Sequence, residues 1–404
     1  MADHGPRGAD LIRQRYGWVV VACAFTLTFV GFGVAYSFAA FFKAFQAEFG
    51  APRAHISLVF SLCALLWFSF GVPGGLLADR FGPRGVCLAG ALAIAAGLAA
   101  AAHAPSLQLL YLTYSIGIGV GIGLAYVPSV AAVQHWFVQN RVLAGGIAVS
   151  GIGAGNLLVP PLAAWWIELW GWRGAYLGLM TLTLAAAVPA ALLLGGRAAT
   201  RAHAAGTSLP GMTLGEAVRS RPFWLIYAVG FLVCVGVFVP MVHLVPYARD
   251  VGLSDAQGVA LVSLLGLGSL LGRFAMGGIA DRLGHVRSLV AIGTGLGLLF
   301  LVWWVATSFW LLAAFAVSFG TLYGGYVALM PTVNMEVFGP RGLSAILGTQ
   351  YTAAGFATLA GPTFAGASFD AFGSYDAPIL GCAALSFAGA ALAAAMRRHF
   401  RSPA

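Results

Sequence analysis

Charged side chains are scarce in this 404-residue sequence: Asp, Glu, Lys and Arg make up 8% of it, whereas about 25% is usual in a soluble domain. The water-exposed surface of a soluble protein cannot be built from so few, so that class is excluded. Hydrophobic residues make up 60% and occur in runs of roughly 20, the length of a transmembrane helix. These runs lack the alternation typical of outer-membrane barrel strands. We therefore predict an all-α membrane protein.

Cysteine and clustered titratable residues are also scarce. The chain has five cysteines, an odd number, at unrelated spacings inside apolar runs: Cys23, Cys63, Cys87, Cys234 and Cys382. They indicate small buried hydrophobes and no disulfide framework or metal site. The apolar runs contain neither paired carboxylates nor clustered histidines, so we expect no enzyme activity, no metal and no cofactor.

The apolar residues fall into twelve segments that predict twelve transmembrane helices. These are approximately 17–41, 55–78, 85–103, 107–133, 142–165, 173–195, 222–247, 257–281, 287–307, 309–333, 343–368 and 375–396. A polar linker rich in Gly and Arg separates the sixth from the seventh. We predict an N-terminal six-helix bundle at 1–196, a cytoplasmic linker at 197–221 and a C-terminal six-helix bundle at 222–404.

Lysine and arginine are distributed unevenly over the predicted loops. Sixteen lie in the termini and even-numbered loops, and four lie in the odd-numbered loops. Positive charge is enriched on the cytoplasmic side of membrane proteins, so we expect both termini in the cytoplasm and a multi-pass protein of the cytoplasmic (inner) membrane. The net charge of +9 is then a topology signal, and we expect no nucleic-acid partner.

The two halves of the sequence repeat a motif. "GGLLADRFGPR" (74–84) follows the second segment, and "GGIADRLGHVR" (277–287) follows the eighth, half the chain later. Two related bundles with a site between them at mid-membrane are the layout of an alternating-access transporter. A channel would need a pore-lining filter, which a two-bundle repeat does not favour.

This repeated pattern resembles the cytoplasmic loop signature of the major facilitator superfamily. The resemblance implies two pseudo-symmetric bundles of six helices. In that superfamily such loops latch the cytoplasmic side in one state, which implies a gating role for the acidic and basic residues of both copies. A packing role alone is the other interpretation. These residues are Asp79, Arg80, Arg84, Asp281 and Arg282.

A second motif is similar to one in the monocarboxylate transporter family. "WFVQNRVLAGGIAVSGIGAG" (136–155) resembles that family's fifth-helix signature, with matches at Phe137, Arg141, Leu143, Ala144, Gly146, Ala148, Gly151 and Gly155. Trp136, Gln139 and Asn140 depart from it. "RFAMGGIAD" in the eighth segment resembles the stretch around that family's substrate-binding arginine, which falls on Arg273. Bacterial oxalate–formate exchangers belong to the same wider group.

Arg273 stands alone in an otherwise uncharged segment. An arginine at the centre of a membrane helix costs about 2.5–3.5 kcal/mol. It precedes Asp281 by eight residues, roughly 12 Å along a helix, and no Asp or Glu lies at comparable depth. Because a guanidinium binds a carboxylate through two parallel hydrogen bonds, we infer that the missing counter-charge is the substrate. A structural arginine bonded to helix carbonyls and water is the alternative.

A single cation indicates a single carboxylate. The oxalate exchangers resemble this chain at "YTAAGFATLAGP" (351–362), but they carry a lysine where Ala354 stands here. Without that second cation a dicarboxylate would bring an unpaired charge into low dielectric. We therefore favour a monocarboxylate such as lactate, pyruvate or another short 2-oxo or 2-hydroxy acid.

Mid-helix polar side chains are the expected partners of the substrate. A tyrosine can donate a hydrogen bond while its ring closes the cavity. Each tyrosine could equally serve in helix packing or at the membrane interface instead. The candidates are Tyr36, Tyr126, Tyr323, Tyr326 and Tyr351. Tyr323 aligns with a selectivity-determining aromatic residue of the resembled family. Asn156 and Gln350 could face the cavity or a neighbouring helix.

The group that carries the proton is less clearly marked. Proton-linked animal members of the resembled family carry an Asp one turn before the arginine and a Lys in the first helix, where this chain has Ser269 and Tyr36. His243 is the other titratable group at some depth, and histidine titrates near neutral pH. We consider it the proton-coupling candidate. It could also be an outward-end histidine bonded to a carbonyl, with the acid and Arg273 sharing the proton directly.

Three functions remain, in this order. The first is a secondary transporter that moves a small monocarboxylate anion with a proton by alternating access, acting as a monomer surrounded by membrane lipid. The second is an organic-anion exchanger of the oxalate–formate type. The third is a non-transporting membrane sensor.

Overall fold

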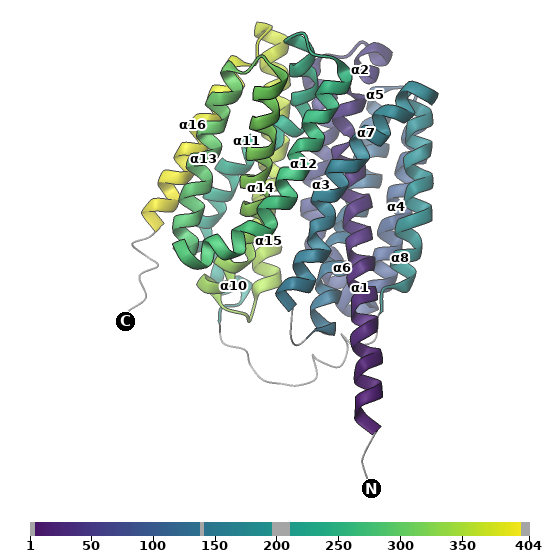
Figure 1. The fold of residues 1–404 in the computed structure, drawn as a ribbon, viewed down its shortest axis with the longest axis vertical. Helices are drawn as coiled ribbons and strands as arrows, with labels where there is room; N and C mark the ends of the chain where they lie inside the picture. Colours follow the sequence, from purple (N-terminus) through teal and green to yellow (C-terminus); the bar gives the residue numbers. More distant parts are fainter. Residues whose placement is uncertain (1–4, 138–140, 196–210, 397–404) are drawn as a thin grey trace.

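A computed structural model describes residues 5–137, 141–195 and 211–396, and all its regular elements are helical. The long helices lie side by side in one bundle (Figure 1). The start of the first helix and the end of the last one point to the same end of the bundle, which we call the near end. The opposite end is called the far end.

The N-terminal half begins with a helix that is longer than the sequence predicts. After α1 (Gly5–Tyr36) the chain continues into α2 (Phe38–Phe49), where the predicted segment stops at residue 41. Four phenylalanines of α2 are buried, whereas Lys43 is exposed. The half continues with α3 (Arg53–Phe81), α4 (Pro83–Ala102), α5 (Leu107–Tyr114), the π-helix η1 (Ser115–Val120), α6 (Gly121–Trp136), α7 (Arg141–Leu182), the π-helix η2 (Thr183–Ala187) and α8 (Val188–Leu193).

The C-terminal half starts with a short helix in the described part of the linker, α10 (Leu214–Val218). Thr213 and Glu216 form a capping box at its N-terminus. The remaining elements are α11 (Arg221–Asp250), α12 (Asp255–Leu283), α13 (His285–Val305), α14 (Phe309–Phe338), α15 (Leu343–Phe372) and α16 (Asp376–Met396). A second capping box, between Ser254 and Gln257, fixes the start of α12. Residues 196–210 of the predicted linker lie outside the described chain.

The number of long helices agrees with the sequence once one break and one less apolar helix, α15, are counted. Ten described helices are long and apolar enough to cross a membrane. One of them, Leu143–Leu193, holds 51 residues and is broken at Gly171 (φ 69°, ψ 172°), a left-handed conformation that glycine adopts without strain. It therefore represents the fifth and sixth predicted helices. α15 has 30 residues, long enough to cross a membrane although it is not among the ten, and with it the count reaches the twelve helices that the sequence predicts.

The largest contacts between the halves are those of α3 with α15, α7 with α12, and α2 with α11, and α2 also touches α12. Glycine allows the backbones to approach closely in the first two of these pairs. A Cβ atom on Gly266 of α12 would lie 2.5 Å from the backbone nitrogen of Leu157 in α7. At the pair α3–α15, a Cβ atom on Gly366 would lie 2.7 Å from the Cα atom of Ala54.

Replacement of Gly266 with alanine is expected to destabilise the protein. The added methyl group must push α12 away from α7, and overpacking of this kind costs about 1–3 kcal/mol. The shift of the unfolding midpoint in detergent measures the effect. Gly381→Ala in α16 is the matched control, because a Cβ there meets no atom within 4 Å. An equal loss in both variants would contradict a tight α7–α12 contact.

Candidate functional site

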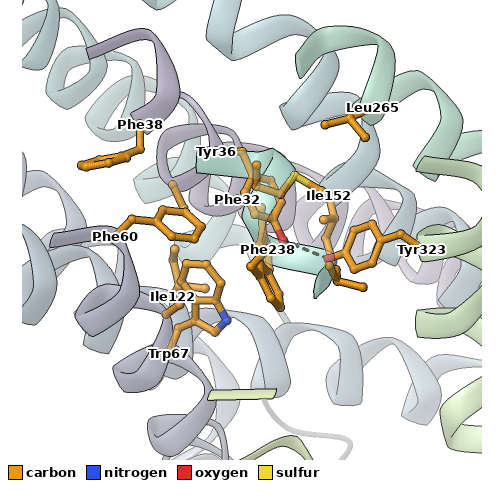
Figure 2. Packing of buried hydrophobic residues seen from close by; sticks show 14 of the residues in the cluster. Phe32, Tyr36, Phe38, Phe60, Trp67, Ile122, Ile152, Phe238, Leu265 and Tyr323 are labelled. Atoms are coloured by element: carbon orange, nitrogen blue, oxygen red, sulfur yellow. Dashed lines mark hydrogen bonds between the residues drawn. The ribbon is translucent and has the colours of Figure 1, made fainter. Parts of the chain in front are cut away.

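A cavity lies between the two halves. Its lining comes from α1, α3, α6 and α7 of the first half and from α11, α12, α14 and α15 of the second. Its empty space amounts to about 700 Å³, including the part that opens to solvent. Apolar side chains such as Phe32, Phe68, Ile152 and Phe238 form much of the wall. Figure 2 shows Phe32, Ile152 and Phe238 near Tyr36 and Tyr323.

Arg273 is the charged residue in the described lining of this cavity. Its Nε, Nη1 and Nη2 atoms are all buried, and none has a hydrogen-bond partner within the described chain. A guanidinium has five N–H donors and stays ionised at any physiological pH. An unpaired buried charge is strongly unfavourable. The arrangement therefore favours a ligand that brings negative charge and paired acceptor atoms.

All five predicted tyrosines line the same cavity as Arg273: Tyr36, Tyr126, Tyr323, Tyr326 and Tyr351. The hydroxyl oxygens of Tyr36 in α1 and Tyr323 in α14 lie 3.0 Å apart and share a buried hydrogen bond, drawn as a dashed line in Figure 2. This bond connects the two halves directly. A ligand that inserts between these hydroxyls would break this hydrogen bond between the halves and could accept or donate one hydrogen bond to each tyrosine instead.

The two amide side chains differ in position. Gln350 lines the cavity and donates a hydrogen bond from Nε2 to the carbonyl oxygen of Phe223, at 3.0 Å. Asn156 is buried in α7 and is absent from the described lining. Its Nδ2 atom faces the sulfur of Met241 at 3.8 Å, and its Oδ1 atom has no partner in the described chain. The structure thus places Asn156 in the seam between the halves, and we remove it from the binding site.

His243 lies away from the cavity, toward the far end of α11. Its side chain is fully buried, and both ring nitrogens have oxygen neighbours. Nδ1 lies 2.9 Å from the Tyr375 hydroxyl, and Nε2 lies 2.8 Å from the carbonyl oxygen of Pro362 and 3.0 Å from Ser57 Oγ. Proton coupling at the binding site would require His243 to contact a substrate bound to Arg273. In this structure His243 does not lie where it could make that contact.

The residues assigned to gating lie at the near end of the bundle. Arg80, Arg84 and Arg282 are exposed there, at the ends or beginnings of helices. The side chains of Asp79 and Asp281 lie outside the described part of the chain. The gating role of these five residues stays a prediction.

A second group of polar residues, at the far end, was missed by sequence reasoning. Arg53 at the start of α3 binds Asp250 at the end of α11 with both terminal nitrogens, at 2.6 and 2.8 Å. Lys43 of α2 pairs with Asp255 of α12 at 2.6 Å. Each pair crosses between the halves and joins residues about 200 positions apart, for which a single sequence carries no pairing signal.

Comparison with known proteins agrees with this geometry. Residues 22–303 and 229–403 match the family described as the Major Facilitator Superfamily. Monocarboxylate transporter 13 of Bos taurus is 31% identical over 389 residues, which cover 95% of this chain and 90% of the relative. Monocarboxylate transporter 3 of Rattus norvegicus is 32% identical over 397 residues, covering 93% and 79%. The chain belongs to the monocarboxylate transporter family of the major facilitator superfamily.

Membership in the monocarboxylate transporter family confirms the predicted fold class and a multi-pass membrane protein. Its relatives are transporters, so the chain is a transporter and not an enzyme. Monocarboxylate transporter 12 of Xenopus laevis, 31% identical over 394 residues that cover 90% of this chain and 85% of the relative, extends the match to another member. The family implies a small monocarboxylate as the substrate class.

Proposed function

We propose that this transporter moves a small monocarboxylate of the lactate or pyruvate type across the cytoplasmic membrane, together with a proton, by alternating access. Arg273 binds the carboxylate in this proposal. The observation that carries it is the buried guanidinium with three unpartnered nitrogen atoms, in a cavity lined by both halves. Tyrosine hydroxyls and Gln350 surround it and supply hydrogen bonds to the rest of the acid.

The lining favours one carboxylate over two. In the described lining Arg273 is accompanied by no lysine and no second arginine, and Ala354 occupies a place on α15 where oxalate exchangers carry a lysine. A second carboxylate would therefore enter a largely apolar cavity without a counter-charge, which is unfavourable. The same lining contains no Asp or Glu to pair with an ammonium group, so it also disfavours amino acids.

The arrangement of ion pairs supports alternating access. Both ion pairs between the halves in the described chain, Lys43–Asp255 and Arg53–Asp250, lie at the far end. The positive-inside distribution of Lys and Arg supports a cytoplasmic near end. We therefore interpret the structure as closed to the outside, and the far end is called the outer end below. We further propose that the protein acts as a monomer in the lipid bilayer.

Uptake of labelled acids into proteoliposomes tests this function. An outward-acidic pH gradient across vesicles without internal substrate is expected to drive uphill accumulation of lactate or pyruvate, because a symporter couples the acid to the proton. Dissipation of the gradient with a protonophore should abolish accumulation but leave equilibration intact.

The same assay tests the alternative functions. An organic-anion exchanger would accumulate label only when the vesicles contain an internal anion. A non-transporting sensor would bind the acid in detergent but show no uptake under either condition. If accumulation requires an internal anion and does not depend on the pH gradient, the protein is an exchanger and the proposal of proton symport is wrong.

A further inference from the structure

We propose that His243 is the proton-sensing residue of an outer gate: its neutral ring holds the gate closed, and its protonation outside opens it. The inference rests on the proposed function for the orientation of the chain. It gives His243 a place in the transport cycle that is separate from the binding of the acid, which takes place in the cavity around Arg273.

The gate consists of contacts that hold α3 of the first half against the second half at the outer end. The guanidinium of Arg53 binds both oxygens of Asp250 and donates to the hydroxyl oxygen of Tyr375 at 2.8 Å. Asp370 of α15 accepts hydrogen bonds from the backbone nitrogens of Arg53 and Ala54, at 2.9 and 2.8 Å. Opening the outer end must break all of these bonds.

The surroundings of His243 fix which nitrogen carries the proton in the closed gate. The carbonyl oxygen of Pro362 can only accept, so Nε2 must donate to it. The hydroxyl of Ser57 uses its hydrogen on the carbonyl oxygen of Arg53, at 2.7 Å, and its oxygen is free to accept from Nε2 as well. In the neutral ring Nδ1 is then an acceptor, and the nearby Tyr375 hydroxyl donates to it.

These assignments form one directed chain of hydrogen bonds. Arg53 donates to the oxygen of Tyr375, Tyr375 donates to Nδ1 of His243, and Nε2 donates to Pro362. Every donor has an acceptor. The chain links the ion pair Arg53–Asp250 to the interior of the second half through a ring that is fully buried.

A proton on Nδ1 breaks this order. The oxygen of Tyr375 would then face donors on two sides, and its own hydrogen would lose its acceptor in a buried place, where an unsatisfied donor is unfavourable. The imidazolium would also share its surroundings with the Arg53 guanidinium, which repels it. The charges that face this region are Arg53 from α3, Asp250 from α11 and Asp370 from α15, while α2 contributes the uncharged ring of Phe42.

Opening of the gate removes this penalty. Movement of α3 away from α11 and α15 exposes the ring to water, where imidazole titrates near pH 6.5. The open state therefore binds the proton better than the closed state, and acid outside favours the open state. By linkage, the ratio of open to closed protein is expected to rise about tenfold between pH 8 and pH 5.5.

A spin-label distance measurement tests the gate directly. Gln108 of α5 and Thr307, which precedes α14, are exposed at the outer end of the two halves. Both are replaced with cysteine in a full-length protein whose five native cysteines are replaced with serine or alanine. Double electron–electron resonance at pH 8 and pH 5.5 should show the long-distance population growing at the lower pH. His243→Gln, which keeps a donor and an acceptor but cannot bind the proton, should change less than twofold.

Two further variants make the test specific. His103 is an exposed histidine at the same end, bonded to the Ala99 carbonyl of its own helix, so His103→Gln should keep the full pH response. Tyr375→Phe removes the hydroxyl that donates to Nδ1 and should reduce the response below threefold with His243 in place. A full response in both His243→Gln and Tyr375→Phe would overturn the proposal, as would its loss in His103→Gln.

Failure of the gate and failure of the proposed function give different results. Arg273→Lys should reduce uptake of the acid about a hundredfold while the distance change with pH persists. Should Arg273→Lys transport normally and the distance change still depend on His243, the binding proposal fails and the gate stands. If Arg273→Lys reduces uptake as expected but the measured distances do not change with pH in any variant, the gate proposal fails and the binding proposal stands.

Discussion

Replacement of Arg273 with lysine is expected to reduce monocarboxylate uptake about a hundredfold. Lysine keeps the positive charge but not the planar pair of donors that matches a carboxylate. The loss of one charge-assisted hydrogen bond, worth about 1.5–3 kcal/mol, corresponds to a factor of about 10–150 in affinity. Lysine cannot make the same pair of contacts from α12, since the three N–H donors of its ammonium all lie on one nitrogen.

Initial rates of labelled lactate or pyruvate uptake, with the substrate concentration varied, measure this effect. The loss should appear mainly in the apparent affinity. Arg287→Lys is the matched control, because Arg287 is exposed at the start of α13, and it should transport like the unmodified protein. Uptake by Arg273→Lys within twofold of normal would contradict bidentate binding of the carboxylate.

Replacement of Ala354 with lysine is expected to cause the second-largest change, a reversal of substrate preference. Ala354 lines the cavity on α15 and faces the same space as Arg273. An added ammonium there would be an uncompensated buried cation when a monocarboxylate binds, and it would pair with the second carboxylate of a dicarboxylate. Monocarboxylate uptake should fall at least about tenfold, and oxalate should become a competitor.

Competition of unlabelled oxalate against labelled pyruvate measures the reversal. Ala354→Met fills a similar volume without charge, so it separates the steric effect from the electrostatic one. We expect it to lower uptake of both kinds of acid and to leave oxalate a poor competitor. If Ala354→Met and Ala354→Lys give the same preference, charge at this position does not select the substrate.

The fold could be predicted almost entirely from the sequence. Scarce charge and long apolar runs specify membrane helices, and the repeated loop motif specifies two halves. The extension of the first helix through α2 was missed because Lys43 and Glu48 suggest a loop, while the buried phenylalanines on one face of α2 hold it in place. The break at Gly171 was predicted correctly as a boundary between two segments.

The site could be predicted where a residue was conspicuous in its helix. Arg273 is a charge in an apolar run, and the tyrosines are polar groups at mid-helix, so both kinds stand out. His243 and Asn156 could not be placed because α11 and α7 are apolar nearly all around, and no polar face shows which side meets the cavity. The pairing of Arg53 with Asp250 depends on how the two halves meet.

The most direct test of the account is an experimental structure of the protein with a monocarboxylate bound. We expect both carboxylate oxygens to lie about 2.7–2.9 Å from nitrogen atoms of the Arg273 guanidinium, the usual length of such charge-assisted bonds, with tyrosine hydroxyls around the rest of the acid. A structure in which protein oxygens bind all three guanidinium nitrogens, with the acid bound elsewhere, would contradict it.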